Sequence, residues 1–352
     1  MTAPGPHNAI TDVPGVLVGH FHRMADGWAT GTTVVLTPAG ATGGVDARGG
    51  APGSRETDLL APQNLVQQVH GVCLSGGSAY GLAAADGVMR WLGERQHGFP
   101  VGAQPHEVVP IVPAAVVFDL PRSAWGNRPD AEFGYAACAA AATGPVAEGC
   151  VGAGTGAKVG SLSGGVGTAS EVTSSGFTVG ALAVVNASGE AVDFATGRPW
   201  AADHQLAGEF GVAAWPDRPG ERPAGAAAPL NTTIGVVATD AALTKAECRR
   251  LAMSAQDGLA RAIRPAHSMF DGDTVFALAT AERELTTAQG PFAAPMRAAA
   301  LDELCAAAAR TFARSIVRGM LQATAVAGMP AYRDIWPGVV GGGGHRPAPG
   351  TA

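Results

Sequence analysis

The apolar residues of this chain follow two patterns, short continuous runs and longer stretches with helical spacing. The runs predict buried strands, at residues 16–20, 32–36, 69–74, 112–120, 177–186, 191–194, 232–238 and 274–277. The helical spacing predicts helices, at residues 79–95, 131–143, 245–264 and 295–326. Strands and helices do not alternate strictly, which favours a layered sheet sandwich with outer helices over a doubly wound parallel sheet.

Composition and charge narrow the class of protein. The 352 residues are 47% hydrophobic, which is enough for a large core, and the formal net charge of -6 argues against a nucleic-acid surface. Apolar runs stay shorter than the about 18 residues of a membrane span. Five cysteines without CxxC spacing suit a reducing compartment, and the N-terminus lacks the pattern of a signal peptide. We therefore expect a cytoplasmic protein that binds neither nucleic acid nor membrane.

Two segments are poor in periodic apolar residues. Residues 215–229 are rich in Pro, Arg, Gly and Ala and predict a linker that leads to Asn231. Residues 337–352 contain a run of four glycines and predict a disordered tail.

The Asn231-Thr232 junction lies where this linker becomes a strand. A threonine hydroxyl is a weak nucleophile that needs a base, and cleavage of the chain before Thr232 would supply its own α-amine as that base. The unperturbed pKa of an α-amine is about 7.7 to 8.0, so part of it is unprotonated at pH 7. Threonine is also typical of the start of a strand. The local sequence alone leaves both interpretations open.

Glycine-rich loops contribute further candidate residues. Gly76 and Gly77 turn the 69–74 strand into a helix, where their N–H groups can serve an oxyanion or the glycines can serve close packing alone. Ser78 does not form a nucleophile elbow, because Tyr80 stands where G-x-S-x-G requires glycine. Lys158 is the single cation of the glycine-rich loop 151–160, where it either lines a site or lies at the surface.

Polar residues at two strand ends complete the set of candidates. Asn186 ends the 177–186 strand, where it either initiates a turn or aims its amide at a developing oxyanion, an effect of about 3 kcal/mol. Asp271 and Asp273 flank a glycine directly before the next strand. This Asp-Gly-Asp sequence is either a turn or a pair of carboxylates at a site.

Taken together, these motifs resemble the P1 peptidase family, which includes D-aminopeptidases, β-aminopeptidases and nylon-oligomer hydrolases. The motifs are residues 45–50, 76–82, 152–154 with Lys158, 185–186, 231–234 and 271–277. They follow the family's order between about residues 8 and 335, and their joint occurrence is specific although no single motif is. The Asn-Thr junction and the Asp-Gly-Asp pair are most similar to the nylon-oligomer hydrolase branch, since the β-aminopeptidase branch uses a serine nucleophile.

The resemblance implies a fold and a processing event. The expected fold is a four-layer αββα sandwich of the N-terminal-nucleophile hydrolase type. The chain is expected to cleave itself between Asn231 and Thr232 into an α chain, residues 1–231, and a β chain, residues 232–352, which stay together as one composite domain. Members of the family commonly assemble as homotetramers of such heterodimers.

The resemblance also implies a role for each candidate residue. Thr232 is the nucleophile and its α-amine the base, Asp271 and Asp273 orient and charge-balance that amine, Lys158 tunes it, and Asn186 helps to hold the oxyanion. The reaction would pass through an ester on Thr232 that water hydrolyses, and it needs no metal or cofactor. The expected substrates are amides of small peptides or of amino-acid and aminohexanoate oligomers.

Other functions remain compatible with the motifs. Ornithine acetyltransferases resemble this fold and expose a threonine nucleophile, but an amine acceptor replaces water in their second step. An aminopeptidase with a preference for D- or β-amino acids is a second alternative. A binding protein that never cleaves itself is a third.

Overall fold

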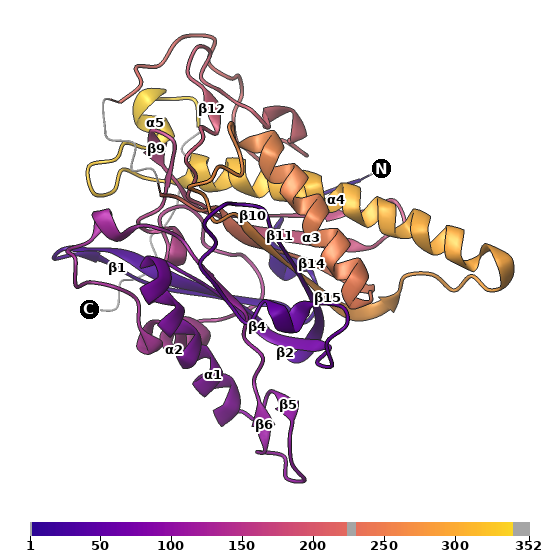
Figure 1. Cartoon of the computed structure of the whole chain (residues 1–352). Coiled ribbons are helices and arrows are strands. Elements are labelled where there is room, and N and C mark those ends of the chain that lie inside the picture. Colours follow the sequence, from indigo (N-terminus) through magenta and orange to yellow (C-terminus); the bar gives the residue numbers. More distant parts are fainter. Residues whose placement is uncertain (1, 224–229, 341–352) are drawn as a thin grey trace.

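A nine-stranded sheet organises the described part of the chain, which comprises residues 2–223 and 230–340 of a computed structural model (Figure 1). The order is β10-β11-β14-β15-β2-β4-β7-β3, and β1 pairs with β2 outside this path. These strands are β1 (Leu17–Ala25), β2 (Trp28–Ala47), β3 (Ser54–Arg55), β4 (Gln68–Ser75), β7 (Ala114–Val116), β10 (Gly165–Val172), β11 (Thr178–Val185), β14 (Ile234–Ala242) and β15 (Thr274–Glu284). Three two-stranded pairs consist of β5 (Phe99–Pro100) with β6 (Val108–Val109), β8 (Lys158–Val159) with β9 (Leu162–Ser163), and β12 (Val192–Asp193) with β13 (Arg198–Pro199).

Two pairs of helices cover the sheet. The α-helices are α1 (Ala84–Glu94), α2 (Ala131–Ala139), α3 (Lys245–Ala262), α4 (Ala293–Gln322) and α5 (Tyr332–Ile335). Short 3-10 helices are η1 (Ile10–Asp12), η2 (Asp58–Leu60), η3 (Ser78–Ala83), η4 (Leu120–Arg122), η5 (Gly152–Gly154), η6 (Ala202–His204) and η7 (Gly290–Phe292). A capping box starts α3, since the Thr244 hydroxyl accepts the Glu247 N–H and the Glu247 carboxylate accepts the Thr244 N–H.

The long strand β2 belongs to both halves of the sheet. Its residues 32–36 pair with β4, and its residues 42–47 pair with β15. The register shifts between Leu36 and Ala41, where Pro38 and Gly40, with a φ of +87°, interrupt regular pairing. This irregularity bends β2, so the sheet folds back on itself and forms two layers.

The buried side chains fall into three main clusters that define four layers. One cluster lies between the two sheet halves and includes Val35, Val72, Val236 and Phe276. A second lies between β11, β14, β15 and the helices α3 and α4, and the third lies between β2, β4 and the helices α1 and α2. Figure 1 shows α1 and α2 on one side of the strands and α3 and α4 on the other. The αββα sandwich predicted from the motifs is therefore confirmed.

The structure differs from the predicted elements in several places. The 112–120 run forms only the short strand β7, because the chain turns into η4 after Asp119. The strand β10 was missed, because glycine, serine and threonine dominate it. Val340 pairs with Val212, so the predicted tail is wrong for residues 337–340, and residues 341–352 lie outside the described residues.

The small residues of β10 allow α4 to approach the sheet closely. A Cβ on Gly167 would lie 2.0 Å from the Ser315 carbonyl oxygen, and one on Gly165 would lie 2.8 Å from the Gly319 carbonyl oxygen. These distances are below any van der Waals contact. Glycine is therefore required at both positions for the helix to lie at its observed distance.

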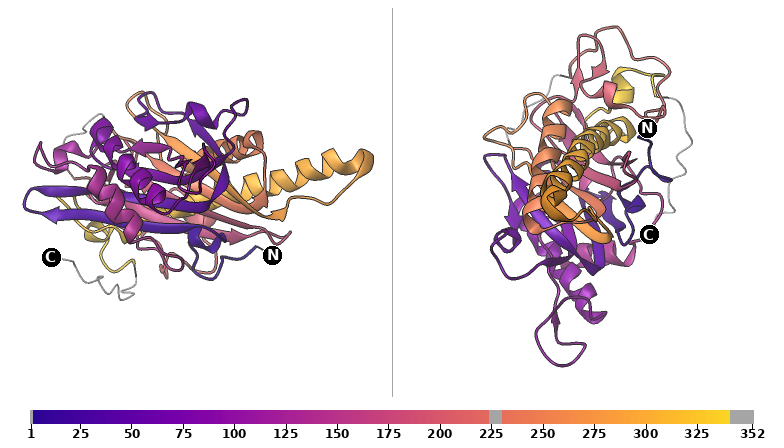
Figure 2. Two further views of the ribbon diagram at one scale, coloured as in Figure 1. Left: turned by 90° about the horizontal axis from the view of Figure 1, so that it is seen from below. Right: turned by 90° about the vertical axis from the view of Figure 1, so that its right-hand side faces the viewer.

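The helix α4 extends beyond the rest of the fold at its N-terminal end (Figure 2). Phe292 and Met296 are exposed there, while Phe312 and Met320 near the other end are buried in the core. Within residues 2–223 and 230–340, no helix combines the length and apolar character needed to cross a membrane.

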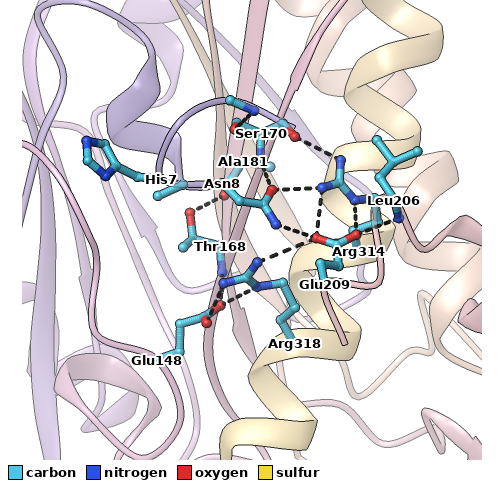
Figure 3. Close-up of polar contacts among 12 residues, drawn as sticks. His7, Asn8, Glu148, Thr168, Ser170, Ala181, Leu206, Glu209, Arg314 and Arg318 are labelled. Carbon is cyan, nitrogen blue, oxygen red and sulfur yellow. Dashed lines mark hydrogen bonds and ion pairs between the residues drawn. The ribbon is translucent and has the colours of Figure 1, made fainter. Parts of the chain in front are cut away.

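Three arginines on successive turns of α4 form ion pairs with glutamates that precede Thr232 in the chain. The pairs are Arg310–Glu171, Arg314–Glu209 and Arg318–Glu148. Figure 3 shows the central part of this arginine ladder, in which Arg314 also donates to the Ser170 carbonyl at 2.9 Å and to Asn8 Oδ1 at 2.7 Å. The Arg314 side chain is fully buried. Although burial acts to raise the pKa of Glu209, the hydrogen bonds and charge of Arg314 hold it below its ordinary value.

Replacement of Arg314 by methionine is expected to lower the free energy of unfolding by about 3–5 kcal/mol, because it leaves the buried Glu209 carboxylate without its main cation. Thermal and urea unfolding of Arg314→Met and wild type measure the difference. Arg250→Met, at an exposed position of α3, is the matched control. Equal stability of the two variants would show that the ladder contributes little.

Candidate active site

Parallel pairing of β14 with β15 brings the Asn-Thr junction beside the Asp-Gly-Asp sequence. Ile234 pairs with Thr274. Three residues earlier in each segment, a parallel bridge joins Asn231 to Asp271. The carboxyl end of β11 lies on the other side of β14, since these two strands are antiparallel neighbours. Three segments that are distant in sequence therefore meet at Thr232.

The Thr232 side chain lies in a buried, hydrogen-bonded position. Its Oγ1 donates to the Asn231 carbonyl oxygen and accepts the Gly272 N–H at 3.2 Å. The Gly272 N–H also lies 3.2 Å from the Asn231 carbonyl oxygen. The Thr232 nitrogen donates to the Asn186 carbonyl at 2.5 Å, and the residue is 5% exposed. The hydroxyl, the carbonyl before it and one donor for that carbonyl thus lie together.

The two aspartates hold this arrangement from one side. Asp271 Oδ1 accepts the Ser188 N–H at 3.1 Å, and Asp271 Oδ2 accepts the Ser268 N–H and hydroxyl. Asp273 Oδ1 accepts the Thr233 N–H at 2.8 Å. Asp273 Oδ2 accepts the His267 N–H at 3.0 Å and lies 2.9 Å from the His267 ring Nδ1. Each aspartate is 1% exposed, so both carboxylates are fixed by hydrogen bonds.

Lys158 and Asn186 lie next to each other on the opposite side. The Lys158 N–H donates to Asn186 Oδ1 at 3.0 Å, and the Asn186 amide donates to the Phe118 carbonyl at 3.4 Å. Lys158 is 6% exposed, so the interpretation as a surface lysine is wrong. Burial, followed by repulsion from Arg122, lowers the pKa of the Lys158 ammonium, while Glu190 and Asp271 act in the opposite direction.

The Gly76 and Gly77 N–H groups are directed to acceptors inside the protein. Gly76 donates to the Gly31 carbonyl at 2.9 Å, and Gly77 donates to Asp119 Oδ1 at 2.6 Å. A Cβ on Gly76 would lie 2.2 Å from both Asp119 Oδ2 and Thr30 Oγ1. Of the two roles left open by the sequence, the geometry favours close packing, and the donor beside the Asn231 carbonyl is Gly272.

Four polar residues around this site were not predicted from the sequence. Ser188, His267 and Ser268 contact the two aspartates, and Asp119 holds the Gly76-Gly77 turn. His267 and Ser268 directly precede the Asp-Gly-Asp sequence, which is the signal that could have found them. Nothing in the local sequence marks Asp119, because its partners come from β2 and from the turn after β4.

Within the described residues, no group of three or more histidine, cysteine, aspartate or glutamate side chains is arranged to hold a metal ion. Two histidines of β1 that lie two residues apart, His20 and His22, have partners within the protein. His20 Nδ1 lies 2.9 Å from Thr33 Oγ1, and His22 Nδ1 accepts the Gly152 N–H at 3.4 Å. Burial, followed by the charge of His22, lowers the pKa of His20 to about 4.

Comparison with models of protein families assigns this chain to a family. The model of peptidase family S58 matches residues 8–333. The chain belongs to peptidase family S58. This membership confirms the resemblance drawn from the motifs.

An uncharacterized aminopeptidase of Mycobacterium tuberculosis is 55% identical over 351 residues, with 95% of this chain and 99% of that protein covered. A 6-aminohexanoate-oligomer endohydrolase of Paenarthrobacter ureafaciens is 33% identical over 298 residues, with 79% of this chain and 77% of that protein covered.

Solved structures of two aminopeptidases share the fold. A β-aminopeptidase from Burkholderia sp. superimposes with a TM-score of 0.69 at 25% identity, covering 95% of this chain and 92% of its own. An L-aminopeptidase D-Ala-esterase/amidase from Ochrobactrum anthropi, described as a variant of the Ntn hydrolase fold, gives a TM-score of 0.67 at 25% identity, covering 91% and 88%. The family S58 chain is therefore an enzyme of the N-terminal-nucleophile class.

The Asp119 carboxyl is a site at which protonation and stability are linked. Burial raises its pKa from 3.8 to about 6, against the opposing effects of the Thr30 hydroxyl and the Gly77 N–H. Because the folded state binds this proton more tightly than the unfolded state, the free energy of unfolding falls as pH rises between about 4 and 6. Asp119→Asn keeps both hydrogen bonds without the charge, since its amide oxygen can accept from Gly77 and its NH₂ can donate to Thr30.

We expect the stability advantage of Asp119→Asn over wild type to grow as pH rises from about 4 to 6 and to stay constant above pH 7. Thermal unfolding midpoints at pH 4 to 8 measure it. Asp217→Asn, at an exposed position, is the control for a lost surface charge. Parallel pH curves for wild type and Asp119→Asn would contradict the assigned burial effect.

Proposed function

We propose that the chain cleaves itself between Asn231 and Thr232 and then hydrolyses amide bonds with the Thr232 hydroxyl as nucleophile. The observation that carries the proposal is the position of Thr232 Oγ1 against the Asn231 carbonyl, with the Gly272 N–H 3.2 Å from both oxygens. A donor at this position stabilises the negative charge that develops on the carbonyl oxygen during attack.

Self-cleavage begins with attack of Thr232 Oγ1 on the Asn231 carbonyl carbon. The new C–O bond replaces the C–N bond between the two residues, and the hydroxyl proton passes to the Thr232 nitrogen. Water then hydrolyses the ester and leaves the Asn231 carboxylate and the Thr232 α-amine. The Asn186 carbonyl, 2.5 Å from that nitrogen, fixes the position of the new amine.

Substrate hydrolysis repeats the same chemistry on an external amide. The Thr232 α-amine accepts the hydroxyl proton as Oγ1 attacks and passes it to the substrate nitrogen, so that the C–N bond breaks and the amine leaves. Water then hydrolyses the ester, which releases the substrate acid and restores the Thr232 hydroxyl. Asp271 and Asp273 orient the segment that carries Gly272 and the Thr233 N–H. The Lys158 ammonium, buried beside Asn186, acts on the pKa of the Thr232 α-amine. A cation near an amine lowers its pKa, which increases the unprotonated share at neutral pH.

Several buried interactions support continued association of the two chains. The strand β14, which would begin the β chain, lies between β11 of the α chain and β15. The arginine ladder connects α4 of the β chain to glutamates of the α chain. The homotetramer of such heterodimers, expected from the resemblance, stays a prediction.

The names of two relatives support a proposal for the substrate class. Proteins of the family are named as aminopeptidases, and a 33% identical relative is named as a 6-aminohexanoate-oligomer endohydrolase. We propose amides of small peptides or of amino-acid and aminohexanoate oligomers as substrates. Release of an amine from such an amide, measured by chromatography, tests this directly, and formation of a new amide with an added amino acid would identify an acyltransferase instead.

Intact-mass spectrometry of the purified protein tests the nucleophile. Wild type is expected to give two fragments that meet at Asn231 and Thr232, Thr232→Ala a single uncut chain, and Thr232→Ser two fragments, because serine keeps the hydroxyl. A single uncut wild-type chain would remove the α-amine from the mechanism.

Gly272→Ala tests the donor. An added Cβ would lie 2.6 Å from the Ala51 carbonyl oxygen and 2.9 Å from Thr232 Oγ1, so the backbone at Gly272 must move. We expect the rate of self-cleavage to fall about 100-fold or more, as for other small misplacements of a reacting group. Gly126→Ala is the matched control, because nothing lies within 4 Å of its added Cβ. Cleavage of Gly272→Ala at the wild-type rate would exclude this N–H as the donor.

A further inference from the structure

In the uncut chain, Asn231 lies in a built binding site of its own. It is 2% exposed. Its N–H donates to the Phe270 carbonyl at 3.1 Å, its carbonyl oxygen lies 3.2 Å from the Gly272 N–H, and its side-chain Nδ2 donates to Ser188 Oγ at 3.0 Å. The residue runs parallel to the chain at Asp271 and is bridged to it. The backbone N–H, the backbone carbonyl oxygen and the side-chain Nδ2 of Asn231 thus each contact a separate group.

The chemistry of Thr232 makes this site the acyl site of the enzyme. During self-cleavage, Asn231 becomes the acyl group of an ester with Thr232 Oγ1, and during substrate hydrolysis the substrate supplies the acyl group of the same kind of ester. Both acyl groups are bonded to the same oxygen and need the same donor for the carbonyl oxygen. A substrate acyl residue therefore occupies the position that Asn231 holds in the uncut chain.

We infer that, within the proposed substrate class, this site prefers α-aminoacyl groups with a carboxamide side chain, and that Ser188 is the specificity-determining residue. The inference rests on the proposed function. The Phe270 carbonyl receives the N–H of the acyl residue, which places the nitrogen on the carbon next to the reacting carbonyl. Ser188 Oγ receives the side-chain amide, as it does for Asn231.

The position of Ser188 suits this task. It follows the end of β11 within the turn Asn186-Ala187-Ser188-Gly189, and its backbone N–H is held by Asp271 Oδ1 at 3.1 Å. Replacement of the side chain leaves that backbone hydrogen bond in place. A change at Ser188 Oγ is therefore expected to alter recognition of the acyl side chain without moving Asp271.

Leucine is the discriminating competitor, because its side chain has nearly the shape of asparagine without the polar atoms. A polar group in a site that hydrogen-bonds it is favoured over an apolar isostere, which leaves the partner unpaired. For one neutral hydrogen bond the expected preference is about 3- to 10-fold in kcat/KM.

The experiment compares asparaginyl and leucyl 4-nitroanilides on wild type, Ser188→Ala and Ser188→Thr. Wild type is expected to prefer the asparaginyl substrate about 3- to 10-fold, Ser188→Ala to lose this preference through a fall for the asparaginyl substrate alone, and Ser188→Thr to retain it. Ser174→Ala, whose hydroxyl contacts Glu303 on the surface, is the matched control and keeps the wild-type ratio.

A second readout uses the chain itself as the substrate. In cell-free synthesis, the rate of self-cleavage is measured for Asn231→Leu, Ser188→Ala and the double variant. We expect each single variant to slow cleavage about 3- to 10-fold and the double variant to be no slower than the single ones, because both remove the same contact.

The outcomes separate this inference from the proposed function. Equal use of both anilides by wild type, an equal fall for both in Ser188→Ala, or additive effects on self-cleavage would overturn the role of Ser188 while the nucleophile stands. A wild-type chain that stays uncut and hydrolyses no amide would overturn the proposed function itself.

Discussion

The parallel pairing of β14 with β15 is the constraint on which the site depends. Neighbouring parallel strands start at the same edge of a sheet, so the residues before each strand must lie side by side. The segment before β14 carries the Asn231-Thr232 bond, and the segment before β15 carries Asp271, Gly272 and Asp273. The register Ile234 with Thr274 therefore places the Gly272 N–H against the Asn231 carbonyl. A shift of this register by one residue would move the Gly272 N–H away from the Asn231 carbonyl. It would also turn the side chains of the shifted strand to the other face of the sheet.

Close packing of backbone on backbone maintains that register. Gly49 lies against the Asp271 carbonyl, where an added Cβ would be 2.2 Å from the oxygen, and Gly167 lies equally close to α4. The 42–47 segment of β2 pairs with β15 from its other side, and β2 carries the same chain into the second sheet half. The long strand β2 thus connects the site to both halves of the sandwich.

The sequence predicted the parts of this structure that depend on local pattern. Apolar runs located β11 and β14, and helical spacing located α3. The motifs located Thr232, Lys158 and the two aspartates near one another through resemblance. Local pattern failed for β10, where the close approach of α4 requires glycine at two positions and so interrupts the apolar run. It also failed for Asp119 and Ser188, because their partners are distant in sequence and only the folded chain brings them together.

The burial of the site gives self-cleavage a second role under the proposed function. In the uncut chain Thr232 is 5% exposed, and Asn231 fills the position next to it at 2% exposure. An external amide cannot reach the hydroxyl while Asn231 occupies the acyl site. Hydrolysis of the Asn231 ester therefore produces both requirements for turnover, the α-amine that serves as base and the space that the substrate acyl group needs. A chain that folds but does not cleave would lack both at once, so partial activity of an uncut form is not expected from this geometry.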